Sequence, residues 1–202
     1  MSELVVLQAI RLKGRVSAAD VAATVNLDPT DIAPTLAELL EKGLLLEGKG
    51  SIRITPEGRE RLAALLADER SHLDQDALAG SYADFLSVNG DFKALVTDWQ
   101  IKDGQPNAHD DADYDTSVLA RLSGVHERVV PILTGVSGQL PRLAGYADKL
   151  SAALAKVEAG ETTWLTRPII DSYHTVWFEL HEELIGASGL TREEEAIAGN
   201  AQ

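Results

Sequence analysis

The chain has 202 residues, of which 45% are hydrophobic and 25% are charged, a composition typical of a folded protein with a buried core. It contains no cysteine, which excludes disulfides, thiolate metal sites and a cysteine nucleophile. No apolar run approaches the roughly 18 residues of a membrane span, and the first residues do not form a signal-peptide pattern. We therefore expect a cytoplasmic protein with no membrane partner.

The net charge of −14 is unevenly distributed along the chain. Residues 1–70 hold nine basic and eleven acidic side chains, whereas residues 71–202 hold nine basic and twenty-one acidic ones. An acidic surface repels the phosphates of nucleic acids. Only the N-terminal part is therefore expected to approach DNA.

Helix-start and helix-stop signals divide the first 42 residues into three helices. The helices are predicted over residues 4–12, 18–25 and 29–42. Gly14 ends the first, Ser17 is a suitable N-cap for the second, and Asp28 followed by Pro29 starts the third. Two strands follow over 44–47 and 51–54, joined by the segment Gly48-Lys49-Gly50, and Thr55-Pro56 starts a fourth helix.

This order of elements resembles the winged helix-turn-helix domains of MarR-type bacterial transcription regulators over residues 2–70. The residues that carry the resemblance are Val16–Ala22, Leu39–Leu45 and Ile52–Gly58. The resemblance implies a DNA-binding domain over residues 1–70, with three helices and a two-stranded wing, that acts as a homodimer. Such regulators carry an Asp-Arg pair in a longer wing, whereas here Lys49 and Arg53 are the available cations.

The third helix is the expected recognition helix, and its outward face is poor in positive charge. The expected DNA contacts are Thr30, Asp31, Pro34, Thr35, Lys49 and Arg53. Base edges are usually read by Arg, Lys, Asn or Gln, and the outward face has none of these before Lys42. An alternative therefore stays open, in which the winged helix is an adaptor that docks on a protein or enzyme partner.

The remainder, residues 71–202, is predicted to be an all-α bundle of five to six helices, so that the whole protein is mainly α. Helices are expected over residues 77–88, 91–100, 114–122, 124 onward, 141–159 and 168–185. Asn89-Gly90 is expected to break the first of these, Pro131 to kink the fourth, and residues 102–111 to form a loop. Thr191 begins a capping box with Glu194.

A small-molecule effector site is predicted in this helical domain. His174 and His181 are seven residues apart and so share a helix face with Trp177, and Arg167 precedes them. Such a face is able to hold an anionic or aromatic ligand, although histidine is also common at the boundary of a helical core. The predicted ligand-binding residues are Asp98, Trp99, His126, Arg167, His174, Trp177 and His181.

No metal, cofactor or enzymatic activity is predicted. The four aspartates within residues 110–115 could bind a hard cation, but carboxylates are also favoured at a helix start without a metal. Residues 150–165 are faintly similar to the ligand-binding domains of FadR-like GntR regulators. Their early Asp-plus-His pair is absent here, since Val88 lies four residues after Asp84, so no metal site is transferred.

A metal-dependent enzyme in the bundle is a third hypothesis. The favoured function is a ligand-responsive transcription regulator.

Overall fold

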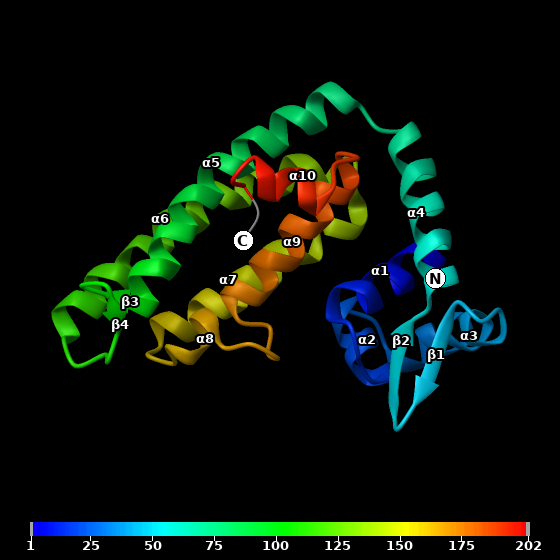
Figure 1. Cartoon of the computed structure of the whole chain (residues 1–202), viewed down its shortest axis with the longest axis horizontal. Coiled ribbons are helices and arrows are strands. Elements are labelled where there is room, and N and C mark those ends of the chain that lie inside the picture. The colour runs from blue at the N-terminus through cyan, green and yellow to red at the C-terminus, as the bar shows by residue number, and fades with distance from the viewer. Residues whose placement is uncertain (1, 201–202) are drawn as a thin grey trace. The chain divides into compact units, whose positions relative to one another are not determined.

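The computed structural model describes residues 2–200 and is mainly helical, with two short antiparallel hairpins (Figure 1). The chain divides into two compact units, Met1–Leu73 and Asp74–Gln202. None of the helices between residues 2 and 200 has both the length and the apolar character that crossing a bilayer requires.

The first unit contains four helices and a hairpin among its described residues. In chain order these are α1 (Glu3–Lys13), α2 (Ala18–Thr24), α3 (Pro29–Glu41), β1 (Leu45–Gly48), β2 (Ser51–Ile54) and α4 (Pro56–Ser71). The predicted helix starts are confirmed, because side chains accept hydrogen bonds from the first free backbone N–H groups. Ser17 accepts from Asp20, Asp28 from Thr30 and Thr55 from Gly58.

The β1–β2 hairpin is closed by a two-residue turn. Lys49 and Gly50 both have positive φ angles, of 54° and 73°, which are the values that a tight hairpin turn requires. Val16 forms an additional bridge to Ile52 and so ties the segment between α1 and α2 to the hairpin. The outer edge of β2 is therefore held by the segment that joins α1 to α2.

The core of the first unit combines one face of the hairpin with the apolar faces of its helices. Its most buried members include Val6, Leu7, Ile10, Ile32, Leu39, Ile52 and Leu62. The helix α4 approaches the hairpin very closely at Gly58. A Cβ atom at this position would lie 2.1 Å from the Leu44 carbonyl oxygen and 2.8 Å from Ile54 Cγ1. Only glycine fits this contact without displacing backbone atoms.

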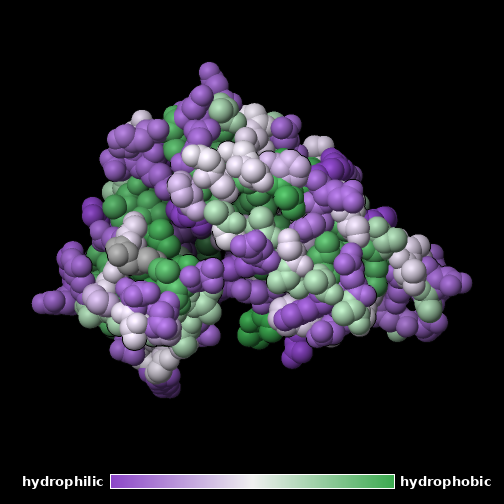
Figure 2. All heavy atoms as spheres, turned by 180° about the vertical axis from the view of Figure 1, so that it is seen from behind, coloured by the Kyte–Doolittle hydropathy of each residue, from purple (hydrophilic) through white to green (hydrophobic). Residues whose placement is uncertain are grey.

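The second unit is built from longer helices. Its elements are α5 (Gln75–Gln100), β3 (Ile101–Lys102), β4 (Gln105–Pro106), α6 (Ala112–Ser137), a 3₁₀ turn (Pro141–Leu143), α7 (Gly145–Glu158), α8 (Thr163–Thr166), α9 (Tyr173–Ala187) and α10 (Arg192–Ile197). The predicted capping box at Thr191 is confirmed. On the face of the molecule in Figure 2, hydrophilic side chains predominate and hydrophobic ones form scattered patches.

Several predicted boundaries in this unit are wrong. The helix α5 is not broken at Asn89-Gly90, because the buried Asn89 side chain accepts a hydrogen bond from Trp177 Nε1 at 2.9 Å and donates one to the Asn200 carbonyl at 3.1 Å. The helix α6 likewise continues through residue 124 and Pro131. The last long helix starts at Tyr173, after the N-cap Ser172, and not at residue 168. The predicted loop 102–111 contains part of the β3–β4 hairpin.

Candidate functional site

The first unit has a groove of about 250 Å³ along the outer face of its hairpin. The groove is lined by Arg15, Leu46, Gly48, Lys49, Ser51 and Arg53. Successive residues of a strand point to opposite faces, and Leu46 pairs with Arg53 across the two strands. These two side chains therefore share the outer face, while Ile52 and Ile54 are directed into the core.

Three cations gather at this groove. Arg15, Lys49 and Arg53 are exposed, and none of them forms an ion pair with another residue in the described part of the chain. Their charges are therefore not compensated locally. Sequence reasoning identified Lys49 and Arg53 but missed Arg15, which lies in the turn before α2. Arg15 precedes Val16, and the pairing of Val16 with Ile52 brings Arg15 to the hairpin. The position of Arg15 next to Val16 was the sequence feature that could have identified it.

The four predicted DNA contacts on α3 do not line this groove. Thr30, Asp31 and Pro34 are exposed, and Thr35 is half-buried. The Thr30 hydroxyl donates a hydrogen bond to the Asp28 carboxylate at 2.6 Å, so it is engaged in the start of the helix. The charged side chain on the outer surface of α3 among these residues is therefore Asp31, and no uncompensated cation lies on this surface.

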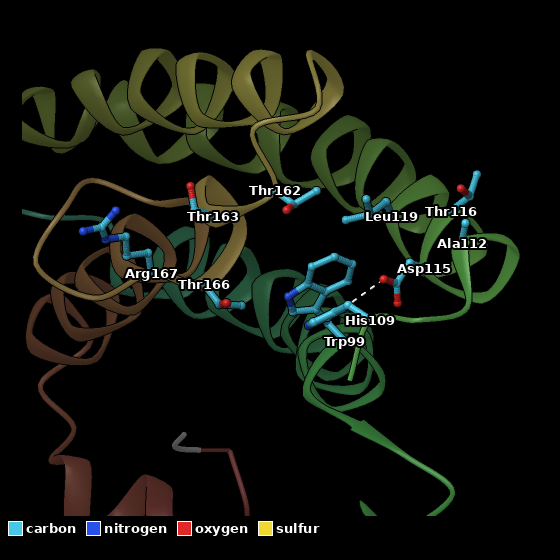
Figure 3. Close-up of a pocket in the computed structure, with 10 residues that line it drawn as sticks. All are labelled: Trp99, His109, Ala112, Asp115, Thr116, Leu119, Thr162, Thr163, Thr166 and Arg167. Atoms are coloured by element: carbon cyan, nitrogen blue, oxygen red, sulfur yellow. Dashed lines mark hydrogen bonds and ion pairs between the residues drawn. The ribbon is translucent and has the colours of Figure 1, made fainter. Parts of the chain in front are cut away.

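The second unit has a larger pocket, of about 720 Å³, at the junction of α5, α6 and α8 (Figure 3). It is lined by Trp99, His109, Ala112, Asp115, Thr116, Leu119, Thr162, Thr163, Thr166 and Arg167. Arg167 and Thr116 lie at opposite ends of this group, and Trp99 lies between them (Figure 3). A pocket of this size suits a small organic molecule.

Asn107 fixes one end of the pocket. Its backbone N–H donates to the Gln100 carbonyl at 2.8 Å, and its Nδ2 donates to the Trp99 carbonyl at 3.1 Å and to Asp115 Oδ1 at 2.9 Å. These bonds join the end of α5, the segment after β4 and the first turn of α6. The position of His109 follows, because its backbone N–H donates to Asn107 Oδ1 at 3.1 Å.

His109 and Asp115 form a polar pair at this end. The imidazole Nδ1 lies 2.9 Å from Asp115 Oδ2, and the imidazole ring packs on the Trp99 indole with 4.3 Å between ring centroids. Burial alone would raise the pKa of Asp115, but the hydrogen bonds from Asn107 and His109 outweigh it and lower that pKa. Asp115 is therefore a carboxylate whose oxygens are both occupied.

The threonine hydroxyls and Arg167 are available to a ligand. The hydroxyls of Thr116, at the Asp115 end, and of Thr162, Thr163 and Thr166, on the α8 side, make no hydrogen bond with another described residue, and the exposed Arg167 makes no ion pair with one. Trp99, Leu119 and Ala112 add apolar surface. The arrangement offers a ligand one positive charge, several hydroxyl groups and an apolar wall.

The structure brings together only two of the seven predicted ligand-binding residues, Trp99 and Arg167, at this pocket. Asp98 lies next to Trp99 in sequence but forms an ion pair with Arg121 at 2.7 Å, away from the pocket lining. The histidine and threonine residues that complete the lining were missed, because their approach depends on the segments after β4 and α7. The Asp-Gly turn of the β3–β4 hairpin was the one local signal for this geometry.

His126 contacts another part of the second unit. Its Nδ1 lies 3.2 Å from the Tyr173 hydroxyl, and its Nε2 lies 3.2 Å from Ser151 Oγ. Burial lowers the pKa of His126 despite the nearby carboxylates of Glu158 and Glu127. Both ring nitrogens are thus occupied by the protein itself.

The predicted face of α9 packs into the core against α5. Trp177 is fully buried between Phe85 and Phe92, with ring centroids 5.1 and 4.5 Å away. His174 packs near Phe92 and His181 near Phe85, with centroids 6.0 and 5.2 Å apart. The three residues share a face as predicted, but they do not line the pocket described above.

His181 belongs to a buried hydrogen-bonded chain. The Tyr82 hydroxyl donates to Glu195 Oε2 at 2.7 Å and lies 3.1 Å from His181 Nε2. Since the single hydroxyl hydrogen goes to Glu195, His181 Nε2 must carry a hydrogen and donate to Tyr82. Burial is the main cause that lowers the pKa of His181 to about 4, so this imidazole is neutral near pH 7.

No metal centre is formed by the residues that the structure describes, because they contain no group of three histidine or acidic side chains close enough to hold an ion. In the acidic segment, Asp111 accepts a hydrogen bond from the Tyr114 N–H and forms an ion pair with Lys102 at 2.7 Å. Its role here is to start α6 and to hold the preceding hairpin.

Comparisons with known proteins add no family to this description. No family model matches the chain, and no curated protein or solved structure matches it significantly.

Proposed function

We propose that the protein is a cytoplasmic, ligand-responsive transcription regulator that binds DNA through a winged helix-turn-helix in residues 2–70. The observation that carries the proposal is the basic groove of Arg15, Lys49 and Arg53 on the hairpin of the first unit. The hairpin is the wing in this interpretation, and α3 is the recognition helix. The order of three helices, a hairpin and a fourth helix supports it.

The expected contacts are mainly with phosphates. Lys49 lies in the hairpin turn, and Arg53 and Arg15 line the groove behind it, so the three cations can contact neighbouring phosphates along one backbone. The acidic surface of α3 adds little affinity. A single copy then binds weakly, and a homodimer that contacts two half-sites is the expected functional form.

The salt dependence of DNA binding tests this proposal. The full chain is titrated into a fluorescein-labelled random-sequence duplex, and anisotropy is measured between about 50 and 200 mM salt. Three phosphate contacts predict a slope of log K against log salt of about −3 per copy. Arg15→Gln, Lys49→Asn and Arg53→Gln should each reduce the slope by about 1. Asparagine also suits the positive φ of the turn, so Lys49→Asn removes charge without disturbing the hairpin.

Arg59→Gln is the matched control. Arg59 is an exposed cation of α4 in the same unit and does not line the groove, so its removal should leave the slope unchanged. Equal slopes for all four variants, or no binding above a protein-free background, would contradict the proposal. Selection of duplexes from the random pool then determines whether binding is sequence-specific.

A second candidate function is an adaptor that docks on a protein partner through the first unit. The observation that favours it is the outer surface of α3, where Asp31 is exposed and no base-reading cation is present. Leu46, which is 47% exposed, adds an apolar contact to the groove. In affinity purification, a stoichiometric protein partner that is lost on Leu46→Ser but kept on Lys49→Asn would favour this function over DNA binding.

A further inference from the structure

The charges around the pocket of the second unit define what kind of molecule it accepts. Arg167 contributes a positive charge at one end that no described residue neutralises. At the other end, Asp115 is held as a carboxylate by Asn107 and His109. A ligand is therefore favoured if its negative charge lies at the Arg167 end, and disfavoured if a second one lies near Asp115.

The middle and the far end of the pocket favour a hydroxylated ring. The Trp99 indole and the His109 ring provide aromatic contacts, and Leu119 provides aliphatic surface. Aromatic rings prefer edge-to-face or offset contact with other rings, which suits a planar ligand. The threonine hydroxyls beside these residues can donate to or accept from a polar substituent of that ring.

The segment that carries Arg167 supplies an independent indication. Ile169, two residues further on, has a φ of 76°, which is costly for a β-branched side chain, and it is 100% exposed. The strain is therefore not offset by burial of the isoleucine. Strained backbone of this kind concentrates at segments that clamp ligands.

We propose that this pocket binds a small aromatic carboxylate with a hydroxyl group at the opposite end of the ring. The carboxylate pairs with Arg167, the ring contacts Trp99 and Leu119, and the hydroxyl meets the polar groups around His109 and Thr116. That the ligand acts as an effector rests on the proposed regulator function, whereas its binding does not.

Calorimetric titration of the full chain without DNA tests the binding. The probes are para-hydroxyphenylacetate, its neutral amide, and phenylacetate, which lacks the hydroxyl. The acid should bind about tenfold or more tightly than its amide, since a charge-assisted hydrogen bond to Arg167 is lost in the amide. Phenylacetate should bind more weakly than para-hydroxyphenylacetate, because its ring leaves the polar end without a partner.

Variants locate the site. Arg167→Gln should abolish the preference for the acid over the amide. Thr116→Val should weaken the binding of both para-hydroxyphenylacetate and its amide, because it removes a hydroxyl that the ring hydroxyl contacts. Arg128→Gln is the matched control, because Arg128 is an exposed arginine of the same unit that pairs with Asp91 outside the pocket. Circular dichroism confirms that each variant is folded.

Three results would overturn the proposal. The first is the absence of saturable heat with every probe up to about 10 mM. The second is an equal affinity for the acid and the amide. The third is a preference for the acid over the amide that is unchanged in Arg167→Gln. All three are measured without DNA, so they are distinguishable from failure of the DNA-binding test. If the acid binds and DNA does not, the pocket is retained and the regulator function is rejected.

Discussion

Replacing His181 should change how the stability of the second unit depends on pH. The imidazole is buried beside Tyr82, and burial is the main cause that lowers its pKa to about 4. The positive charges of Arg192 and Lys93 also lower this pKa, whereas the carboxylates of Glu195 and Glu182 raise it. An unfolded chain has a histidine pKa of about 6.5. Because folding lowers the pKa, protonation favours the unfolded state.

The magnitude follows from these two values. Near pH 7 the His181 imidazole is largely neutral in both the folded and the unfolded state, so its protonation destabilises the folded state very little. As the pH falls through 6.5, the unfolded state takes up a proton that the folded state does not, and at pH 5 the loss amounts to about 2 kcal/mol. Most carboxylates remain ionised at pH 5, so the histidine contribution is measured with little interference from them.

The assay is urea unfolding at pH 7 and pH 5, followed by tryptophan fluorescence. The three tryptophans of the chain, Trp99, Trp164 and Trp177, all lie in the second unit, so the signal reports on that unit. His181→Gln keeps a donor near the Tyr82 hydroxyl but does not titrate, and it should lose about 2 kcal/mol less between the two pH values than the wild type. Equal losses in the wild type and His181→Gln would refute this reasoning.

Three further single substitutions and one double variant test the packing of the two units. Gly58→Ala should destabilise the first unit by about 3 kcal/mol, because the added methyl group meets the Leu44 carbonyl, and its thermal unfolding is followed by circular dichroism. Gly80→Ala, on the exposed face of α5, adds a methyl group that meets nothing within 4 Å and should stabilise by about 1 kcal/mol. Glu183→Gln removes the carboxylate of the buried ion pair with Arg142 and should cost about 3 kcal/mol in urea unfolding. Replacement of both partners, Arg142→Met with Glu183→Leu, should recover most of that loss, and a double variant as unstable as Glu183→Gln would contradict the explanation.

The elements of the first unit were predictable because their signals are local. Ser17, Asp28 and Thr55 each cap a helix from a position immediately before it, and Lys49-Gly50 forms the turn between two short apolar strands. A cap acts through backbone groups two or three residues away, so the printed sequence contains the whole interaction. Predicted and observed boundaries accordingly differ by one or two residues.

The boundaries of the second unit depend on contacts that are distant in sequence. Asn89-Gly90 is a strong breaking signal when taken alone, but Asn89 is held by Trp177, which lies 88 residues away. Inside the helix its side chain satisfies a buried indole N–H that would otherwise lose its partner. Residue 168 illustrates the reverse error, because proline suits a first helical position but α9 is capped four residues later by Ser172.

The candidate pocket was only partly predictable for the same reason. Trp99 and Arg167 were selected for their chemistry, and they meet because α8, a helix of four residues, turns the chain beside α6. So short a helix has no hydrophobic period that a sequence pattern could reveal. His109 is positioned by the side chain of Asn107, and neither residue type signals that interaction in sequence.

The distribution of charge in the first unit constrains how the proposed regulator would recognise DNA. The uncompensated cations lie on the hairpin, whereas α3 presents Asp31 and, further along, Glu38, which pairs with Lys42 at 2.6 Å. Contacts from Arg15, Lys49 and Arg53 to phosphates position a protein but do not distinguish bases. Sequence preference would then have to arise from the shape and flexibility of the DNA, or from the spacing of two half-sites in a homodimer. Duplexes selected from the random pool should therefore share a spacing or an A·T-rich segment, and a selected motif read base by base along α3 would contradict this mode of recognition.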